Sequence, residues 1–415
     1  TMLWVAAWCA AAADSAALAS LASGDRCGEA TDLCARVHAL EPTLPIAPAF
    51  LPAYRTPCLT IGGTPVCLPA VHVISGWHML DEAALGFLKQ VPQLERRSGS
   101  CFDDWPNDGG AARWVSSWGG PLAGGKDALL MTHCNKLLSW YPAFAGRYLS
   151  AWGATYGPCK LRELAKGKAD EAAYYRKAMW EVCRPAALAA HDAAVGSGGS
   201  GREATPPFVM KALYGAHVRI ISALRNPVDR LEISFWEHSH YMRNYGASAE
   251  GLHKYVVEQT AAFETCAVAH GTRRCAQLFE LISKEYADVF FHCDQIIRGL
   301  YEPFVRDWHA AFGAGALLLI SVESLVDAAE SSRKIVLDFL GLPSSAATVL
   351  TPHTKSYMQL HEDSLRKANA ESMLPSTRAL AEKFYRPHNL ALAKLVGVPG
   401  LEWPNSTVIA GLIRK

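Results

Sequence analysis

The sequence contains little charge and almost no excess of either sign. Charged residues make up 19% of its 415 residues, and the formal net charge at pH 7 is +1. Non-specific binding to nucleic acid requires a surplus of basic side chains that neutralise phosphates. The composition therefore excludes nucleic acid as an expected partner, and a polyanionic ligand would need a local basic site.

Cysteine patterns typical of zinc sites are also missing. The twelve cysteines include no Cys-x-x-Cys pair and no zinc-knuckle spacing. Four of them crowd residues 27–67, and Cys266 and Cys275 flank a short polar loop. An even number of cysteines, together with the glycosylation sequon at Asn405, favours an oxidising secretory compartment, the Golgi lumen or the extracellular space. A reduced protein with buried cysteines is the alternative, and the pairing does not follow from the sequence.

A convincing membrane-spanning run is absent as well. Residues 1–25 are apolar and rich in alanine, but they include Asp14 and do not begin with methionine. Alanine is too weakly apolar to make this stretch a good membrane span. Two interpretations remain open, namely the remnant of a signal peptide or signal anchor, and a soluble helix. Membrane contact is expected only through such an N-terminal anchor.

What the sequence does contain is an alternation of strand-like and helix-like segments. Short apolar, β-branched runs predict strands at residues 70–76, 217–224 and 316–325. Apolar spacing predicts helices at residues 79–90, from about Asp229, at 328–343 with a stop at Gly341, and at 376–397 with a bend at Pro387. This alternation predicts an α/β fold with a mostly parallel sheet that is covered by helices on both faces.

The remaining segments are predicted to surround this core. An alanine-rich helix and a stem rich in cysteine and proline are expected over residues 1–69, and the α/β domain over 70–397. A helical insertion is expected at about 105–200, ending in a flexible glycine-rich tip at 195–201. Residues 398–415 would form a C-terminal tail.

The segment LRNPVDR, residues 224–230, raises the first functional hypothesis. Pro227 ends the strand and Asp229 is a suitable cap for the helix that follows. Arg225 and Arg230 then lie at the carboxyl end of the strand, where open parallel sheets bind their ligands. The guanidinium fork suits a phosphate. The alternative is that both arginines pair with nearby acids such as Asp229 or Glu232.

This segment also carries a family resemblance. Residues 219–238, RIISALRNPVDRLEISFWEH, resemble the segment of carbohydrate sulfotransferases that holds the 3′-phosphate of the donor 3′-phosphoadenosine-5′-phosphosulfate (PAPS). Similar blocks follow the family's order at 87–94, 202–209, 299–325, and 336–343 with 384–397. The resemblance spans residues 70–397. It implies a P-loop-like parallel sheet, PAPS as co-substrate of an active enzyme, and a glycan or glycoprotein acceptor.

The donor loop departs from the family's pattern. Counted without a gap from residues 87–94, the family's Lys-Gly-Gly-Thr-Thr falls on His78-Met79-Leu80-Asp81-Glu82. Glycines there let the backbone approach the phosphosulfate, and the lysine neutralises the leaving oxygen. The resemblance makes Ser75, Gly76 and Trp77 donor contacts and puts His78 in the lysine's role.

Two acids in this loop oppose an anionic donor. Two unit charges about 4 Å apart interact by roughly 4 kcal/mol at an effective dielectric constant near 20. Asp81 and Glu82 would therefore offset much of what a helix N-terminus and two arginines supply. Both acids suit the N-terminus of a helix without any ligand.

The base and the 3′-phosphate motif depart as well. Ser98 stands where the family has its glutamate base, and serine does not take a proton unaided near neutral pH. The family's phosphate-binding serine falls on Ile233. Ser234 comes one residue later and would point about 100° away on a helix. Arg225 is kept, and Lys355 is a further candidate phosphate contact.

Three weaker candidates have two interpretations each. Glu203 is either a base or a partner that fixes the arginines. His238 and His240 are either metal ligands or, as we expect, surface or stacking residues, so no metal is predicted. The tryptophans of residues 105–118 either stack on sugar rings or, as we expect, cover the core.

Two functional hypotheses follow. The intact scaffold and the altered donor positions favour a non-catalytic protein with a sulfotransferase fold, which binds glycans or serves as a structural or interaction subunit in a secretory or extracellular assembly. The alternative is an active enzyme that moves a sulfo group from PAPS to a glycan hydroxyl.

Overall fold

The computed structural model describes Val37 and residues 48–61, 63–76, 78–97, 114–115, 117–118, 122–134, 137–139, 150–166, 178–195, 205–343, 354–398 and 400–403. Several predictions lie outside the described residues: the N-terminal apolar stretch, Trp77, Ser98, Trp105, Glu203, most of the 195–201 tip and Asn405. The side chains of Asp81 and Glu82 are also outside them. Within the described part of the chain, no helix combines the length and apolarity that a membrane span requires.

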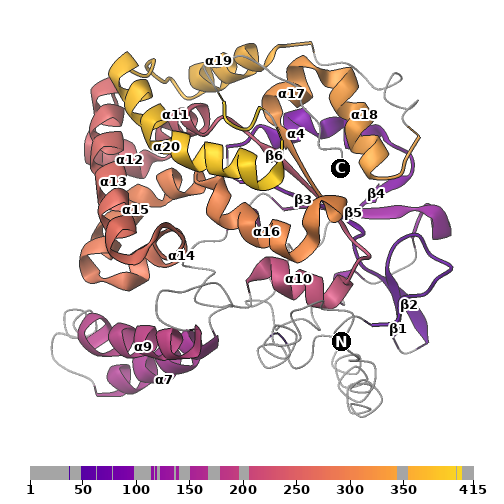
Figure 1. Cartoon of the computed structure of the whole chain (residues 1–415), viewed down its shortest axis with the longest axis horizontal. Helices are drawn as coiled ribbons and strands as arrows, with labels where there is room; N and C mark the ends of the chain where they lie inside the picture. Colours follow the sequence, from indigo (N-terminus) through magenta and orange to yellow (C-terminus); the bar gives the residue numbers. More distant parts are fainter. Residues whose placement is uncertain are drawn as a thin grey trace.

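A five-stranded parallel sheet lies at the centre of the molecule (Figure 1). Its strands run in the order β4-β5-β3-β6-β7, and every neighbouring pair is parallel. The strands are β3 (Val71–Ile74), β4 (Leu94–Arg96), β5 (Leu129–Cys134), β6 (Arg219–Leu224) and β7 (Leu317–Ser321). The predicted fold class, a parallel sheet flanked by helices, is confirmed.

Both faces of the sheet are buried. Successive residues of a strand point to opposite faces, so each strand contributes side chains to two apolar layers. On β6, Ile220 and Leu224 join one apolar cluster, whereas Ile221 and Ala223 join another. The first face is covered by α10 (Pro206–Tyr214), α16 (Tyr301–Ala316) and α20 (Pro375–Val396). The second is covered by α4 (Asp81–Ala84), α17 (Val322–Asp327) and α18 (Ala329–Phe339).

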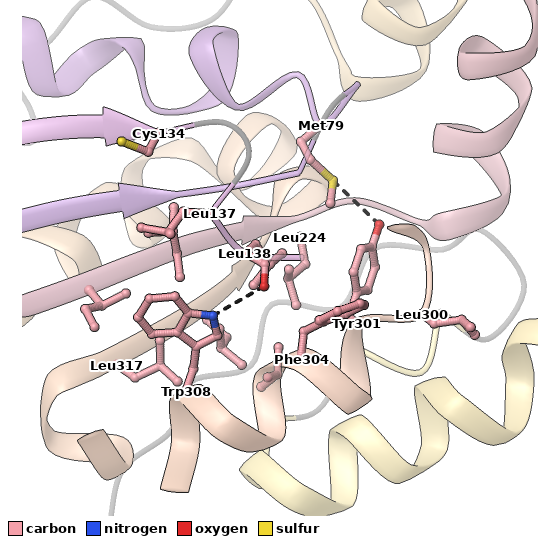
Figure 2. Close-up of a cluster of buried hydrophobic side chains, with 14 of the residues drawn as sticks. Met79, Cys134, Leu137, Leu138, Leu224, Leu300, Tyr301, Phe304, Trp308 and Leu317 are labelled. Carbon is pink, nitrogen blue, oxygen red and sulfur yellow. Dashed lines mark hydrogen bonds between the residues drawn. The ribbon is translucent and has the colours of Figure 1, made fainter. Parts of the chain in front are cut away.

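The first face contains a large buried tryptophan (Figure 2). Trp308 of α16 is fully buried and packs near Leu224 and Leu317. Its indole Nε1 donates a hydrogen bond to the carbonyl oxygen of Leu138 at 3.3 Å. This bond ties α16 to the segment that follows β5.

The remaining helices pack beside the sheet. They are α11 (Pro227–Glu237), α12 (Ser239–Tyr245), α13 (Ala249–His270), α14 (Thr272–Ile282), α15 (Lys284–Arg298) and α19 (Tyr357–Lys367). A disulfide between Cys266 and Cys275 joins α13 to α14.

Several predicted boundaries were wrong. The helix after β6 begins at Pro227, and its cap is Asn226 rather than Asp229, because the Asn226 side chain accepts from the Val228 N–H. The predicted strand 316–325 ends at Ser321, whose side chain caps α17. The predicted helix 79–90 is divided into α4 and a 3-10 helix, η1 (Gly86–Gln90). The helix predicted at 376–397 is confirmed as α20, and Pro387 lies inside it.

The predicted helical insertion is interrupted by a strand. β5 lies inside residues 105–200 and occupies a central place in the sheet, next to β3. The helices of this range are α7 (Ser150–Ala165) and α9 (Arg184–Val195), the latter preceded by a π-helical turn, η4 (Met179–Cys183). A disulfide joins Cys159 to Cys183. Ala187 of α9 packs against Leu278 of α14, which attaches the pair to the main body.

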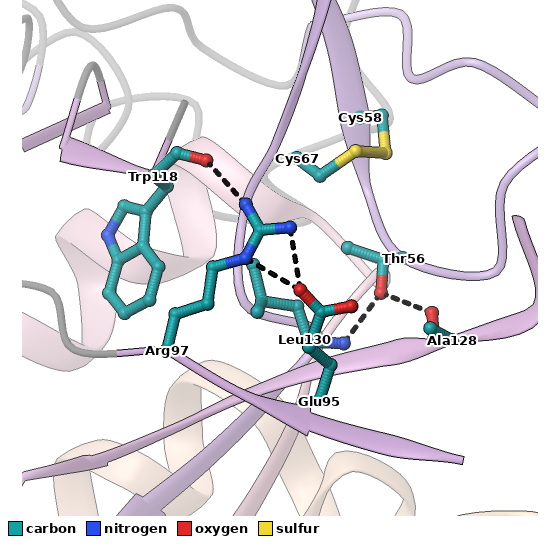
Figure 3. The surroundings of a disulfide bond; sticks show 8 residues. All are labelled: Thr56, Cys58, Cys67, Glu95, Arg97, Trp118, Ala128 and Leu130. Carbon is teal, nitrogen blue, oxygen red and sulfur yellow. Dashed lines mark hydrogen bonds and ion pairs between the residues drawn. A yellow bond between two sulfur atoms is a disulfide. The ribbon is translucent and has the colours of Figure 1, made fainter. Parts of the chain in front are cut away.

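The N-terminal stem contains an ordered hairpin where irregular structure was predicted. Strands β1 (Cys58–Ile61) and β2 (Thr64–Cys67) pair antiparallel and are joined by the Cys58–Cys67 disulfide (Figure 3). The hydroxyl of Thr56 donates to the Ala128 carbonyl and accepts from the Leu130 N–H, both at 2.8 Å. These bonds fix the hairpin to β5.

Candidate functional site

The carboxyl ends of β3 and β6 bring the two principal predicted site residues together. The loop after β3 carries His78, and β6 is followed directly by Arg225. The Arg225 Nη1 donates to the carbonyl oxygen of His78 at 2.9 Å. The main chain of the donor loop is therefore bonded to the arginine that was expected to bind the donor's 3′-phosphate.

In the donor loop, residues 76–82, two non-glycine residues have backbone angles that glycine usually adopts. His78 and Leu80 have φ values of 63° and 55°, in the left-handed region that side chains disfavour. A Cβ added to Gly76 would lie 2.9 Å from the Met79 Cε, which is the far end of a flexible side chain and can move aside. The following helix, α4, has only four residues. The loop thus keeps a strained conformation and leads into a very short helix.

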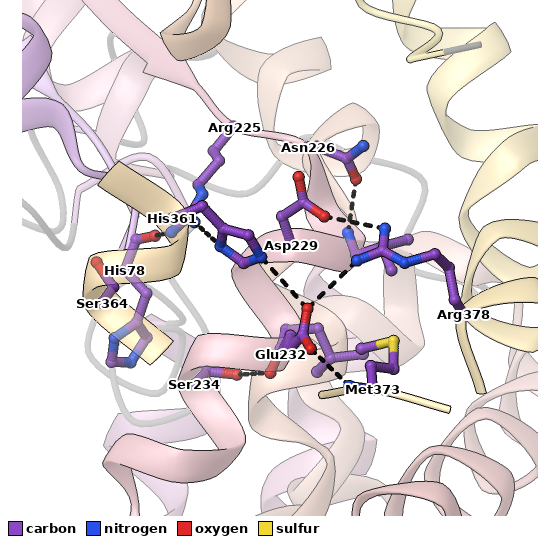
Figure 4. A network of polar contacts seen from close by, with 12 residues as sticks. His78, Arg225, Asn226, Asp229, Glu232, Ser234, His361, Ser364, Met373 and Arg378 are labelled. Carbon is purple, nitrogen blue, oxygen red and sulfur yellow. Dashed lines mark hydrogen bonds and ion pairs between the residues drawn. The ribbon is translucent and has the colours of Figure 1, made fainter. Parts of the chain in front are cut away.

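Arg225 is completely enclosed by the protein, and Figure 4 shows it between His78 and His361. Its side chain has a relative exposure of 0%. In addition to the His78 carbonyl, its Nε donates to the Tyr357 hydroxyl at 3.0 Å and its Nη2 donates to the His361 Nδ1 at 2.6 Å. All three guanidinium nitrogens therefore have partners inside the chain.

Two buried carboxylates lie behind these partners. The Tyr357 hydroxyl donates to Asp229 Oδ2 at 2.9 Å, and the His361 Nε2 lies 3.3 Å from Glu232 Oε2. Arg378 of α20 contacts both acids, with Nη1 at 3.0 Å from Asp229 and Nη2 at 3.2 Å from Glu232. We call these six residues, Arg225, Asp229, Glu232, Tyr357, His361 and Arg378, the arginine network.

Hydrogen bonding assigns the tautomer of His361. An arginine only donates, so the His361 Nδ1 that faces Arg225 must be unprotonated. The ring proton is then on Nε2, where it points to the Glu232 carboxylate. His361 thereby bridges Arg225 and Glu232 through its two ring nitrogens.

The buried carboxylates of the network are compensated by neighbouring positive charges and hydrogen-bond donors. Burial alone would raise the pKa of Asp229, but the charges of Arg378 and Arg225 and the hydrogen bond from Tyr357 act in the opposite direction, and this pKa lies below its ordinary value. Burial also raises the pKa of the Tyr357 phenol, which keeps its proton available for donation to Asp229. The negative charge that a 3′-phosphate would bring to Arg225 is already supplied by the protein.

Within the described residues, Asp229, Glu232 and His361 form the one group of three side chains that approach closely enough to ligate a metal ion. Arg378 already bonds both carboxylates, and Arg225 occupies the His361 Nδ1. The two guanidinium groups thus occupy the positions where a metal ion would bind. The cluster of Asp229, Glu232 and His361 therefore does not fit a metal ion.

The other predicted 3′-phosphate contacts are not arranged for a ligand. Arg230 is fully buried and donates to the Gln295 side-chain oxygen at 3.0 Å and to the Gln295 carbonyl. Ser234 is fully buried and donates to the Leu231 carbonyl at 2.8 Å. Lys355 lies at the surface and is paired with Asp363. Neither Lys355 nor Asp363 contacts the arginine network. The direct pairing of the two arginines with Asp229 and Glu232, the alternative considered above, is also not what the structure contains.

His78 is not a replacement for a permanent cation. Its Nδ1 lies 2.6 Å from Glu237 Oε2, and its Nε2 lies 3.2 Å from the His238 Nε2. Burial lowers the pKa of His78, and the Glu237 hydrogen bond does not fully offset this effect, to which the Arg230 charge adds. His78 is therefore mostly neutral at pH 7, whereas a lysine there would be charged.

The histidine and tryptophan candidates have structural contacts. His238 faces His78, whereas the His240 Nε2 contacts the Asn244 Nδ2. Trp114 and Trp118 are each 1% exposed, so these two tryptophans cover the core, as expected, and do not present a face to a sugar.

Three residues expected at the 3′-phosphate of PAPS do not fit it as they are arranged here. Arg225, Arg230 and Ser234 have no exposed surface and have hydrogen-bond partners within the protein. A phosphate would have to displace these partners and separate Arg225 from its buried counter-charges. Breaking such buried pairing is strongly unfavourable.

Comparison with known protein families identifies one domain within the chain. Residues 205–386 match the model of the sulfotransferase domain. The matched region contains α10, β6, α11 and the arginine network. The resemblance identified from the sequence is confirmed.

The curated relatives are named carbohydrate sulfotransferases. The chain is 26% identical to human carbohydrate sulfotransferase 15 over 204 residues, which cover 48% of this chain and 34% of the human protein. It is 27% identical over 157 residues to carbohydrate sulfotransferase 15 of Nototodarus sloanii, covering 35% of this chain and 87% of that protein. The match thus spans about a third of the human relative's length. A crystal structure of a sulfotransferase from Alicyclobacillus acidocaldarius aligns over 80% of this chain with a TM-score of 0.41 and 14% identity.

Half of the arginine network, namely Tyr357, His361 and Arg378, was not predicted from the sequence. Tyr357, His361 and Arg378 are more than 125 residues beyond Arg225 along the chain, as the separations of 132, 136 and 149 in their bonds to Arg225 and Asp229 show. One signal was present, since Tyr357 and His361 are four residues apart and therefore share a helix face. Their polarity on that face indicated a buried partner.

Replacing Tyr357 by phenylalanine tests the hydroxyl that links Arg225 to Asp229. We expect a loss of about 1–3 kcal/mol in the free energy of unfolding, because two buried polar groups lose a partner while the ring is kept. Urea denaturation monitored by circular dichroism measures this. A variant as stable as the original protein would show that this bond does not hold the network together.

Proposed function

We propose that this protein is a non-catalytic member of the sulfotransferases that binds a glycan without using PAPS. It would act as a glycan-binding or interaction subunit in the secretory pathway or outside the cell. The names of the curated relatives support the carbohydrate ligand. The disulfides Cys58–Cys67, Cys159–Cys183 and Cys266–Cys275 and the sequon at Asn405 support the compartment.

One observation carries the proposal. Arg225, the arginine that the family resemblance assigns to the donor, is 0% exposed and has a protein partner at each guanidinium nitrogen. The buried acids Asp229 and Glu232 neutralise it through Tyr357 and His361. This arrangement is complete without a nucleotide.

An active carbohydrate sulfotransferase is the second candidate function. The observation that favours it is the left-handed backbone of His78 and Leu80, because strain of this kind is common at functional sites. His78 also lies within hydrogen-bonding distance of Glu237 at the carboxyl edge of the sheet. Radiolabelled sulfate transfer from PAPS to a panel of glycans tests this candidate, and any labelled product would refute the non-catalytic proposal.

Donor binding is the decisive experiment. The protein is titrated with 3′-phosphoadenosine-5′-phosphate, and its thermal unfolding is followed. A ligand present at 100 times its dissociation constant stabilises the folded state by about 2.7 kcal/mol. We expect no shift at millimolar nucleotide, because no described 3′-phosphate contact in the buried site is available to the ligand. A concentration-dependent rise in the unfolding temperature would contradict the proposal.

A further inference from the structure

A second site lies at the opposite end of the sheet from the donor loop. A cleft of about 440 Å³ opens at the amino ends of β5, β3 and β6. Its floor includes Val71 and Leu129, and the end of α18 forms one wall. The volume lies in the range of small-molecule sites. The arginine network and His78 do not line it.

Arg55 is held rigidly on one side of this cleft. Its backbone N–H donates to the Lys126 carbonyl at 2.8 Å, and the neighbouring Thr56 is bonded to Ala128, just before β5, and to Leu130 of β5 (Figure 3). Its Nη2 donates to the Leu340 and Gly341 carbonyls, at 3.3 and 2.7 Å. Through these bonds Arg55 links the turn that precedes β5 to the residues that follow α18.

Arg219 supplies a second cation from the first position of β6. It is exposed, its backbone N–H donates to the Ala70 carbonyl at 2.8 Å, and its guanidinium lies 5.9 Å from the centre of the Phe339 ring. Among the described residues, neither Arg55 nor Arg219 forms an ion pair with a carboxylate. Exposed arginines in a cleft that lack a paired acid are suited to an oxyanion.

The cleft also contains acceptors and an apolar surface. The Asp338 carboxylate and the Gly341 carbonyl lie on the α18 side, and Phe339 is half-buried beside Arg219. Acceptors suit the hydroxyl groups of a ligand, and an aromatic ring suits the C–H face of a sugar. Because Asp338 and the helix carbonyls repel negative charge, the site favours a single anionic group over a polyanion.

We infer that this cleft binds a saccharide that carries one oxyanion, either a sulfate ester or a carboxylate, with the oxyanion on Arg219 and Arg55. This inference deepens the proposed glycan-binding role and rests on it. It also assigns that role to the end of the sheet away from the donor loop.

Isothermal titration with three monosaccharides tests the site. The probes are a hexose 6-sulfate, a uronic acid and the parent neutral hexose. We expect the anionic sugars to bind and the neutral one to bind at least tenfold more weakly. The sulfated and carboxylated probes then show which oxyanion is preferred. Equal binding of the neutral sugar, or no binding of either anionic sugar at millimolar concentration, would overturn the inference.

A pair of variants locates the binding. Arg219→Gln is expected to weaken binding of the preferred anionic sugar at least tenfold without changing the urea midpoint, because Arg219 lies at the surface. Arg366→Gln, which removes an exposed arginine of α19 outside the cleft, is the matched control and is expected to bind normally. Unchanged affinity in Arg219→Gln would place the sugar elsewhere. The proposal that the protein does not use PAPS is tested separately, by the nucleotide titration and the sulfate-transfer assay.

Discussion

The Arg225→Ala variant is expected to lose about 3–5 kcal/mol of unfolding free energy, because removing one member of a buried charged network leaves the others unpaired. Arg225 is fully buried, and its loss leaves the Tyr357 hydroxyl, the His361 Nδ1 and the His78 carbonyl each without a donor. Asp229 and Glu232 would also lose a nearby positive charge. Urea denaturation and the yield of folded protein measure the effect.

A matched substitution separates this structural role from a ligand-binding one. Lys355→Ala removes another cation that was predicted to contact phosphate, but Lys355 is 53% exposed and pairs only at the surface with Asp363. Its expected cost is within about 0.5 kcal/mol. If Arg225→Ala were as stable as Lys355→Ala, Arg225 would be a residue available for a ligand, and the non-catalytic proposal would lose its main support.

The Arg378→Ala variant should have the second largest effect, a loss of about 2–4 kcal/mol at pH 7. Arg378 contacts both buried acids, although its own side chain is 34% exposed, which reduces the expected cost relative to a fully buried pair. Without it, Asp229 and Glu232 lie close together with less positive charge around them.

The pH dependence of this loss has a defined sign. The folded-state pKa of Asp229 lies below its ordinary value of 3.8, so the ionised carboxylate contributes stability above that pH. The contribution disappears as the pH falls through the lower, folded-state pKa. The stability difference between the original protein and Arg378→Ala should therefore be complete at pH 7 and shrink below about pH 4. A difference that stays constant down to pH 3 would be inconsistent with charge pairing, and Arg366→Ala, at a 74% exposed position, serves as the control.

The sheet could be predicted from the sequence because its strands are short apolar runs with clear ends. Strands β3, β6 and β7 were all identified, and the position of Arg225 at the carboxyl end of β6 followed directly. β4 and β5 were missed. β4 has only three residues, and β5 lies within a stretch whose flanks are helical or irregular, so neither gave a sufficient local signal.

The chemistry of the site depended on contacts that the sequence does not encode locally. The motif predicted that Arg225 would face either a phosphate or a neighbouring acid. The structure instead links it to Asp229 and Glu232 through side chains of α19, while Arg378 of α20 completes the pairing. Such a network depends on how distant helices pack, and the spacing of residues within one motif does not specify it.

The backbone of the donor loop has a consequence for natural variation. Residues 78 and 80 already follow the path that glycine adopts without strain, and the Arg225 contact that holds this path is to a main-chain oxygen. Replacing the side chains of the loop, for example by glycine, would therefore not require a new backbone path. If the non-catalytic proposal holds, nucleotide affinity would still require the adjoining arginine network to open. On that proposal, a single amino-acid change at either place is not expected to confer sulfo transfer, and a chain with that activity would have to differ at both.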